Sequence, residues 1–580
     1  MEKEKEEIQS RSFVGTLVGE STSKEFRLAV TPEAIREQDI IAVDAALNEI
    51  EDNGGSRKIR VWAKVQKIER INPFFPVEAG HELAETQTNP IETVLSLSRE
   101  IVSAVCQVLG YELKGEESGK LESLRYPPKP ATSAYRPNSE DLERVLVGNL
   151  AENQISVMDI ATLSNRTNVD VKVDGHAIVT RHLAILAMTG AGKSWAARRI
   201  IEELANKNYP MLVFDPRGDY TGLADIEQLH DRVDRYYATF PIFEQDADTV
   251  VQIVNNLGYP LTDTMMTLFS DLFNATKRFY EGEGNERISW LTDRLDDRNA
   301  NYIHQHEIQP DLWLIANIAD AASRSIRDAR DGNHENLEFL QQICWSSLPE
   351  STNPTTLEGI CKRTRRAASQ LRRMETVNQE IAGSAQPMPL DRAELVQDGK
   401  ISIVSLAGYT GDFQATIYSI IAEELFEAKV TKKLKWPFLL LLEEAHNFVP
   451  GRATSVAEQQ SIAITKQIAQ EGRKFHMGLI VISQRPSRLD ETTLSQCNSY
   501  IIMRMVNPAD QTFVKRVVES LGEEEANLLP NLEVGEALLS GQMVNFPILV
   551  KMKEPESRGE REETNAFEYL KKVRTQTSNS

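Results

Sequence analysis

One short segment of the sequence combines glycines, a lysine and a serine in the order that a phosphate site needs. It reads Ala187-Met188-Thr189-Gly190-Ala191-Gly192-Lys193-Ser194, and it lies between an apolar run at residues 183–186 and a helical pattern. Glycines let backbone N–H groups face phosphate oxygens, and the helix N-terminus adds the positive end of its dipole. Lys193 would reach the β- and γ-phosphates, and Ser194 would ligate Mg²⁺. The expected contacts to ATP are Thr189, Gly190, Ala191, Gly192, Lys193, Ser194 and Trp195.

Two adjacent carboxylates, Glu443 and Glu444, follow an uninterrupted apolar run at residues 438–442. Parallel strands that are covered on both faces have such runs, and residues at their carboxyl edge face the ligand. Glu443 would hold Mg²⁺ through water, and Glu444 would orient or deprotonate the attacking water. The alternative is a buried strand that ends at an exposed acidic turn. Because Lys193 lies far upstream, the two motifs meet only if the region between them is an excursion from the core.

Three more polar residues follow apolar runs or a helix. Gln484 comes after residues 479–482 and would sense the γ-phosphate, while Asp215 ends the run at residues 211–214. Arg473 lies at a helix end, where an arginine supplied across a subunit boundary can stabilise transition-state charge. The alternatives are a polar strand end for Gln484, a simple turn for Asp215 and a surface salt bridge for Arg473.

A basic segment at residues 362–373 has six basic side chains and no acidic one among twelve residues. At ~100° per residue the six lie within about half of a helix circumference, opposite Ala367, Ala368 and Leu371. Such a helix can face nucleic-acid phosphates, or it can be a solvated or partner-paired face. The candidate DNA contacts are Arg485, Arg488, Arg365, Arg366, Arg372 and Arg373.

The distribution of apolar residues predicts the domain organisation. Early runs alternate as in β-strands, later runs are short and continuous, and a polar, helical stretch without strong strand signals separates two groups of them. A helical pattern is also expected at residues 90–109, inside or beside the first domain. The expected parts are a small β domain (1–145), a first α/β core segment (146–222), a helical insertion (223–398), a second core segment (399–553) and a polar tail (554–580).

Composition excludes some classes of protein. The 580 residues include 86 acidic and 65 basic side chains, for a net charge of −21, which disfavours a surface that is basic all over but not a local basic channel. No run approaches the ~18 apolar residues of a membrane span, and no signal peptide is visible. The four cysteines are far apart, so we expect reduced thiols in a cytoplasmic protein.

Taken together, these motifs resemble the HerA family of hexameric DNA translocases, relatives of the FtsK motors. The matching strings, besides the phosphate loop, are Arg181-His182-Leu183-Ala184-Ile185-Leu186, Phe214-Asp215-Pro216-Arg217-Gly218-Asp219-Tyr220, Glu443-Glu444-Ala445-His446-Asn447-Phe448, Glu471-Gly472-Arg473-Lys474-Phe475, Ser483-Gln484-Arg485-Pro486, Arg504-Met505-Val506-Asn507-Pro508-Ala509-Asp510 and Leu532-Glu533-Val534-Gly535-Glu536-Ala537. The family often has glycine at the position of Ala187 and serine at that of Ala191, and we expect activity to survive both differences.

The resemblance implies an α/β fold, in which a RecA-like P-loop ATPase core carries an N-terminal small β-barrel and a large helical insertion. It implies Arg181 and Asp215 near the nucleotide, Glu444 as the catalytic residue, Gln484 as sensor and Arg473 as the finger in trans.

The implied activity is ATP-driven translocation on double-stranded DNA by a homo-hexamer. The implied effector is a NurA-like nuclease, a sirtuin-like NADase or another enzyme, in DNA-end processing or antiphage defence, and the insertion and acidic balance favour a bacterial member. The main alternative is an ATP-regulated hexameric scaffold that assembles and activates its effector. A membrane-anchored DNA pump is disfavoured by the lack of a membrane span, and a rotary ATPase subunit is disfavoured by the core strings.

Overall fold

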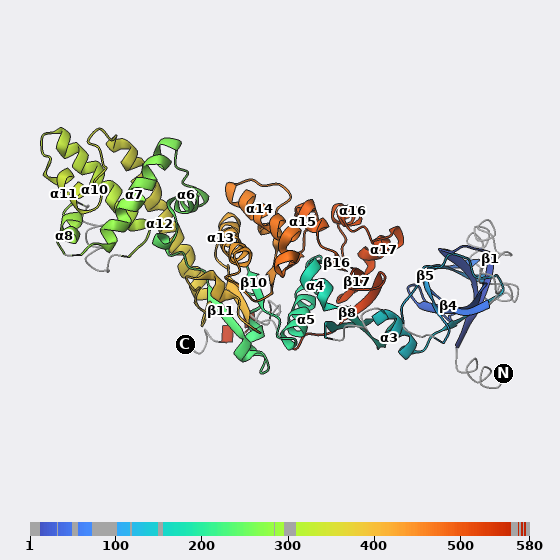
Figure 1. Cartoon of the computed structure of the whole chain (residues 1–580). Helices are drawn as coiled ribbons and strands as arrows, with labels where there is room; N and C mark the ends of the chain where they lie inside the picture. Colours follow the sequence, from blue (N-terminus) through green and yellow to red (C-terminus); the bar gives the residue numbers. More distant parts are fainter. Residues whose placement is uncertain are drawn as a thin grey trace. The chain divides into compact units, whose positions relative to one another are not determined.

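The computed structural model divides the chain into two compact units (Figure 1). Unit 1 contains Met1–Leu204, Gln484–Ser487 and Cys497–Glu556, and unit 2 contains Ala205–Ser483, Arg488–Gln496 and Ser557–Ser580. The structure describes residues 12–31, 33–48, 56–71, 101–115, 119–148, 155–283, 285–294 and 309–557, together with residues 567, 570, 571, 574 and 575.

A closed six-stranded barrel forms the first part of unit 1, with strand order β1-β2-β5-β4-β3-β6. Alternating burial, as at Phe26, Leu28 and Val30 of β2, fills its interior with apolar side chains. The strands are β1 (Ser12–Ser21), β2 (Glu25–Val30), β3 (Ile40–Asn48), β4 (Ser56–Ile71), β5 (Ile101–Leu113) and β6 (Ser133–Arg136).

The helix expected at residues 90–109 is wrong for residues 101–109, which belong to β5; residues 90–100 lie outside the described residues. Val102, Ala104 and Cys106 are buried at every second position, the period of a strand. β5 pairs antiparallel with β2 and with β4, so its backbone hydrogen bonds are made between strands. Barrel closure therefore decided a segment whose apolar spacing fits both kinds of element.

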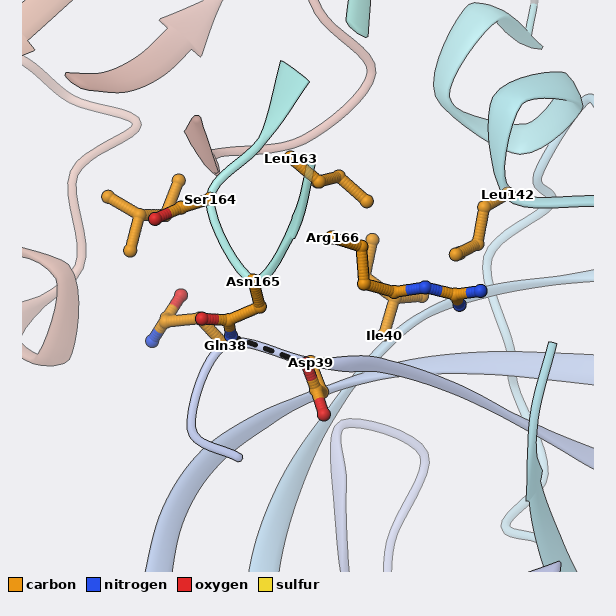
Figure 2. Close-up of a pocket in the computed structure, with 9 residues that line it drawn as sticks. Gln38, Asp39, Ile40, Leu142, Leu163, Ser164, Asn165 and Arg166 are labelled. Carbon is orange, nitrogen blue, oxygen red and sulfur yellow. Dashed lines mark hydrogen bonds between the residues drawn. The ribbon is translucent and has the colours of Figure 1, made fainter. Parts of the chain in front are cut away.

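The barrel packs on the rest of unit 1 through polar side chains. Figure 2 shows the contact beside the hairpin of β7 (Val157–Leu163) and β8 (Arg166–Asp174), where Asn165 donates a hydrogen bond to Asp39 at 3.3 Å and the enclosed space is only about 10 Å³. On another side, Lys64 Nζ of β4 lies 2.5 Å from Glu525 Oε1 of α17 (Glu523–Leu528), and both side chains are buried. Each contact leaves little room for water.

The α/β part of unit 1 contains the strands in the order β9-β16-β17-β18-β7-β8. β9 and β16 are parallel, and the strands that follow pair antiparallel. Its elements are α3 (Ser139–Val147), β7 (Val157–Leu163), β8 (Arg166–Asp174), α4 (Gly175–Arg181), β9 (Leu183–Leu186), α5 (Lys193–Asn206), β16 (Ser499–Met503), α16 (Pro508–Val517), α17, β17 (Glu536–Gly541) and β18 (Ile548–Met552).

Unit 2 contains a parallel sheet with strand order β12-β11-β13-β10-β14-β15. The continuous apolar runs form its central strands because both of their faces are buried. Its strands and the helices that follow them are β10 (Met211–Asp215), β11 (Val233–Tyr237), β12 (Gln386–Pro387), β13 (Ile401–Ser405), α13 (Gly411–Val430), β14 (Phe438–Leu442), α14 (Val456–Glu471) and β15 (Met477–Ser483).

Residues 223–398, expected to be a helical insertion without strong strand signals, contain two strands of this sheet, β11 and β12, and β11 pairs along its length with β13. Its sequence, Val-Asp-Arg-Tyr-Tyr, has no apolar run because it lies near the edge of the sheet. The helices between β11 and β12 are α6 (Ala247–Asn256), α7 (Asp263–Glu281), α8 (Glu286–Thr292), α10 (Leu312–Arg330), α11 (Glu335–Ile343) and α12 (Pro354–Ala382).

Helix α12 connects these helices to the sheet of unit 2 (Figure 1). Near its end the buried Asn378 donates to the carbonyls of Ser405 and Ala407, and its own carbonyl accepts from the backbone N–H of Ala238. The long helix is thus anchored in the core. The mixed α/β fold, with an N-terminal barrel and a helical insertion, agrees with the predicted fold class. Among the described residues, every helix is too short or too polar to span a membrane.

Candidate nucleotide site

The phosphate loop of unit 1 connects β9 to α5. Gly190 and Gly192 have φ of 80° and 100°, a region that disfavours any residue with a Cβ atom. Ala187 is buried and is not among the residues with positive φ, so alanine fits the entry turn without strain. Two hydrogen bonds fix the loop, from Met188 N–H to the carbonyl of Arg504 (3.0 Å) and from Gly535 N–H to that of Ala191 (3.0 Å). The loop is therefore preorganised.

Thr189 at the tip of this loop is hydrogen bonded to Gln484. The Thr189 hydroxyl donates to Gln484 Oε1 at 2.5 Å, although the two residues are 295 positions apart. Gln484 directly follows β15 and is half-buried. A displacement of either side chain therefore acts on the other directly.

The other loop residues differ in exposure. Lys193 is buried at the start of α5, Ser194 is half-buried, and Trp195 exposes 47% of its surface. Arg181 is half-buried at the end of α4, where its carbonyl accepts from Asn498 N–H at 2.9 Å. A hydroxyl such as that of Ser194 is a ligand that Mg²⁺ accepts, and the two left-handed glycines leave space for phosphate oxygens.

In unit 2, the first carboxylate after β14 has a dedicated donor. Glu443 is 0% exposed, and the buried Tyr220 hydroxyl donates to its Oε2 at 2.5 Å. Burial and the neighbouring Glu443 raise the pKa of Tyr220 well above its usual value, so the phenol stays a donor. A carboxylate with one oxygen held in this way has a fixed orientation, as a metal ligand requires.

The second carboxylate has a strained backbone. Glu444 has φ 50° and ψ 48°, the left-handed region, and is 1% exposed. Its Oε1 lies 2.9 Å from a guanidinium nitrogen of Arg217, and its Oε2 lies 3.4 Å from His446 Nδ1. Non-glycine residues in this region cost about 1–3 kcal/mol and cluster at functional sites. This backbone conformation, together with the contacts to Arg217 and His446, holds the Glu444 carboxylate in one orientation.

Asp215 organises the loop that carries Arg217 and Tyr220. Its buried carboxylate accepts backbone N–H groups of all four residues from 217 to 220, at 2.7 to 3.2 Å. Burial raises the pKa of Asp215 above its usual value, although these hydrogen bonds act to lower it. Every hydrogen bond that the structure shows for this carboxylate therefore serves the loop.

Several residues of this site have no role in the sequence motifs. Arg217 and Tyr220 are in the string that begins at Phe214, and only their position after a buried strand indicates that they lie near the site. Gln414 is a second case, because its side-chain amide donates to the carbonyls of Leu406 and Tyr409. It also accepts from Asn447, three residues after Glu444, at 3.0 Å. Nothing in its local sequence indicates this link.

The candidate arginines fall into two groups. Arg473 is exposed in a 3-10 turn (Gly472–Phe475) after α14, and among the described residues its side chain makes no ion pair or hydrogen bond. Arg485 and Arg488 are exposed around the short turn Pro486–Arg488. On α12, Arg365 and Arg372 pair with Asp320 and Asp311, whereas Arg366 and Arg373 are exposed.

Comparisons with known proteins agree with the motifs. Residues 158–425 match the family model "Helicase HerA, central domain". The chain is 26% identical over 563 residues to "DNA double-strand break repair helicase HerA" of Pyrococcus furiosus, covering 93% of this chain and 92% of the relative. A "Probable DNA double-strand break repair helicase HerA" of Methanocaldococcus jannaschii is 27% identical over 440 residues, covering 68% and 76%.

Among solved structures, VirB4 of Thermoanaerobacter pseudethanolicus is similar with a TM-score of 0.43 and 16% identity, covering 69% of this chain and 97% of that one. The bacterial conjugative coupling protein TrwB has a TM-score of 0.41 and 11% identity, covering 73% and 93%. With its phosphate loop, its paired carboxylates and a sequence match that extends over nearly its whole length, the chain is similar to the HerA helicases, whose central-domain model it matches at residues 158–425.

Proposed function

We propose that this protein is an ATP-driven double-stranded DNA translocase that works as a homo-hexameric ring. The observation that carries the proposal is the strained, buried Glu444, whose two oxygens face Arg217 and His446 after a parallel strand. A carboxylate held in a fixed orientation suits a residue that must accept a proton from a water molecule at a defined place. The similarity to relatives named as DNA double-strand break repair helicases supports DNA as the substrate.

In the proposed reaction, Lys193 binds the β- and γ-phosphates while Ser194 and Glu443 hold Mg²⁺. The metal, when bound, neutralises charge on the phosphates. Tyr220 keeps Glu443 oriented, and Glu444 accepts the proton of the attacking water. Arg473, exposed on its own subunit, enters the site of the neighbour.

The Thr189–Gln484 hydrogen bond offers a route from nucleotide to DNA. Loss of the γ-phosphate would change the position of Thr189, and Gln484, to which Thr189 is hydrogen bonded, would move with it. Arg485 follows immediately, with Arg488 close behind, so a shift of Gln484 displaces two exposed cations that we place on the DNA of the ring pore. Contacts to phosphates alone permit movement that is independent of sequence.

The partners remain those that the family resemblance implies. We propose that the ring acts in the cytoplasm with a NurA-like nuclease, a sirtuin-like NADase or another effector, in DNA-end processing or antiphage defence. The acidic balance of the chain keeps the exterior from competing with the pore for DNA.

The test is ATP hydrolysis by Glu444→Gln. Loss of a general base lowers kcat by about 100-fold or more, while binding of a fluorescent ATP analogue persists. Glu427→Gln is the matched control, because Glu427 is exposed on α13. Near wild-type turnover by Glu444→Gln would refute the catalytic assignment. A triplex-displacement assay then tests movement: effector activation without strand displacement by the wild-type protein indicates the scaffold instead.

A further inference from the structure

A pocket of about 650 Å³ lies in unit 2 between α12 and the loops that face it. It is lined by Tyr259, Arg366, Ser369, Gln370, Arg373, Met374, Val377, Gly408 and Thr410. The lining contains two guanidinium groups and no carboxylate, in a chain whose net charge is −21. Its volume is in the range of about 300–1,000 Å³ that small-molecule sites have.

Ion pairing separates the arginines of α12 into two kinds. Arg365 lies 3.2 Å from Asn317 and 3.8 Å from Asp320, and Arg372 lies 2.9 Å from Asp311. In contrast, the guanidinium groups of Arg366 and Arg373 make no hydrogen bond or ion pair within the part of the chain that the structure describes. They are also the two that line the pocket.

The free arginines have a defined spacing. Positions seven apart lie on the same face of a helix, about 10 Å apart along its axis. Gln370 lies between Arg366 and Arg373 on this face of α12. The two guanidinium groups can only donate hydrogen bonds, whereas the Gln370 amide can both donate and accept. Consecutive phosphates along a nucleic-acid strand can be met by two such groups, and guanidinium groups bind phosphate oxygens in pairs.

The lining residues outside α12 supply an aromatic ring and a helix end. Tyr259, between α6 and α7, is half-buried, and tyrosine rings stack on nucleobases. Thr410 is the N-cap of α13 and its side chain makes no capping hydrogen bond, so that it is available to a ligand. Gly408 has φ 89°, and a Cβ there would lie 2.8 Å from Val377 Cγ1, so this part of the lining approaches α12 closely.

The pocket has a rigid base. Asn378, one residue after Val377, is fully buried, and its amide donates to the carbonyls of Ser405 and Ala407, just before Gly408. A site that is already shaped loses less entropy when it binds its ligand.

We propose that this pocket binds a phosphate-bearing nucleotide unit, either one within a nucleic-acid strand or a free nucleotide. Arg366 and Arg373 would bind flanking phosphates, and Tyr259 would stack on the base. An acidic peptide also pairs with arginine, but it does not use an aromatic wall or a pocket of this volume. The strand form rests on the proposed DNA translocase and goes beyond it, since it adds a contact for an unpaired DNA strand on the helical insertion.

Binding to the full-length protein tests the proposal with two probes. Thymidine 3′,5′-bisphosphate has two phosphates around one base and lacks the triphosphate that the phosphate loop takes, and a fluorescein-labelled dT12 represents the strand. Arg366→Ala/Arg373→Ala is expected to weaken binding by about tenfold or more, and to lower the salt dependence of dT12 binding by about 1.4 in log–log slope. The control is Lys433→Ala/Lys435→Ala, which removes the same charge from exposed positions after α13. It should leave the affinity for both probes and the salt dependence of dT12 binding unchanged.

A second measurement locates the bound strand on the protein. A dT12 with one 5-iodouracil should photo-crosslink to Tyr259 in the wild-type protein, as read by mass spectrometry, and not in the double variant. Retained ATP hydrolysis and an unchanged melting temperature show that the double variant is folded. Lys193→Ala abolishes hydrolysis but leaves the crosslink, which separates this inference from the proposed motor activity.

The outcomes discriminate between sources. If the double variant binds both probes more weakly, the pocket is a general nucleotide site. Weaker binding of dT12 alone supports a site for a strand, and weaker binding of the bisphosphate alone supports a site for a free nucleotide. The proposal is overturned when the double variant binds both probes as the wild type does, or when the wild type binds neither. It is also overturned when the binding of poly-aspartate depends on Arg366 and Arg373 but the binding of the two nucleotide probes does not, because an acidic peptide is then the occupant.

Discussion

Arg217 forms an ion pair with Glu444, at 2.9 Å between a guanidinium nitrogen and Oε1. The two residues come from different loops of unit 2, one after β10 and one after β14, and those strands are parallel neighbours. Arg217 is 51% exposed whereas Glu444 is almost fully buried. A cation at the surface therefore holds a buried carboxylate whose backbone is already strained. Arg217 is a positioning residue for Glu444 if Glu444 is the base.

The first prediction concerns this ion pair. Arg217→Ala is expected to lower kcat for ATP hydrolysis by about tenfold, equivalent to about 1.4 kcal/mol of transition-state stabilisation. KM for ATP should stay within about twofold, and Arg217→Lys should recover part of kcat. Steady-state kinetics measure both. Arg324→Ala is the control, because it removes a surface pair with Asp320. A raised KM with normal kcat would mean that Arg217 binds the nucleotide instead.

The second prediction concerns Tyr220. Tyr220→Phe removes the hydroxyl that donates to the buried Glu443, and an unsatisfied buried acceptor costs about 1–3 kcal/mol. Denaturant unfolding of the variant should show this loss at pH 7 and equally at pH 9. The reason is that the raised pKa of Tyr220 keeps the folded-state phenol protonated, so the contribution declines only as the unfolded phenol ionises near pH ~10. A loss that already differs between pH 7 and pH 9 would contradict this account.

The third prediction follows from Glu375 on α12. Burial raises its pKa to about 7, Asp311 adds to the rise, and Arg372 and a hydrogen bond from the backbone of Phe240 oppose it. The folded state then holds a proton that the unfolded state releases above pH ~4.5. Stability should therefore fall as pH rises from about 4.5 to 7 and level off above that. Glu375→Gln should be more stable than wild type at pH 8 and nearly equal at pH 4.5, as measured by urea midpoints. If Glu375→Gln were more stable than wild type by the same amount at both pH values, titration of Glu375 would not be the cause of the pH dependence.

The fourth prediction concerns the buried pair that joins the barrel to the rest of unit 1. Lys64→Met or Glu525→Leu alone leaves an uncompensated buried charge and should cost about 3–5 kcal/mol. The double variant should recover most of this loss, because two apolar groups replace two charges. Unfolding of all four proteins completes the double-mutant cycle. Additive losses in the double variant would show that the two side chains act independently.

Short continuous motifs were predictable because their chemistry is local. The glycines of the phosphate loop, Lys193 and Ser194 are adjacent in the chain, and the apolar runs before Asp215 and Glu443 indicate strands covered on both faces. The family resemblance and the fold class rest on these strings.

Elements with ambiguous periodicity were not predictable. Ile101 to Leu109 has apolar spacing that suits a helix, yet pairing with two neighbouring strands makes it β5. β11 has no apolar run and becomes a strand through its pairing with β13. In both cases hydrogen bonds to distant segments outweigh a weak local preference.

The sequence by itself determined which side chains could do chemistry: a lysine and a serine on a glycine-rich loop, two glutamates after a strand, and a run of arginines. Only the tertiary structure decided what each of them meets. It placed Arg217 on Glu444 and Tyr220 on Glu443, and it divided the arginines of α12 into Arg365 and Arg372, paired with acids, and Arg366 and Arg373, which face a pocket. The physical reason is that residue type and spacing fix the charge and the helix face, whereas a partner contributed from hundreds of positions away depends on how the whole chain packs.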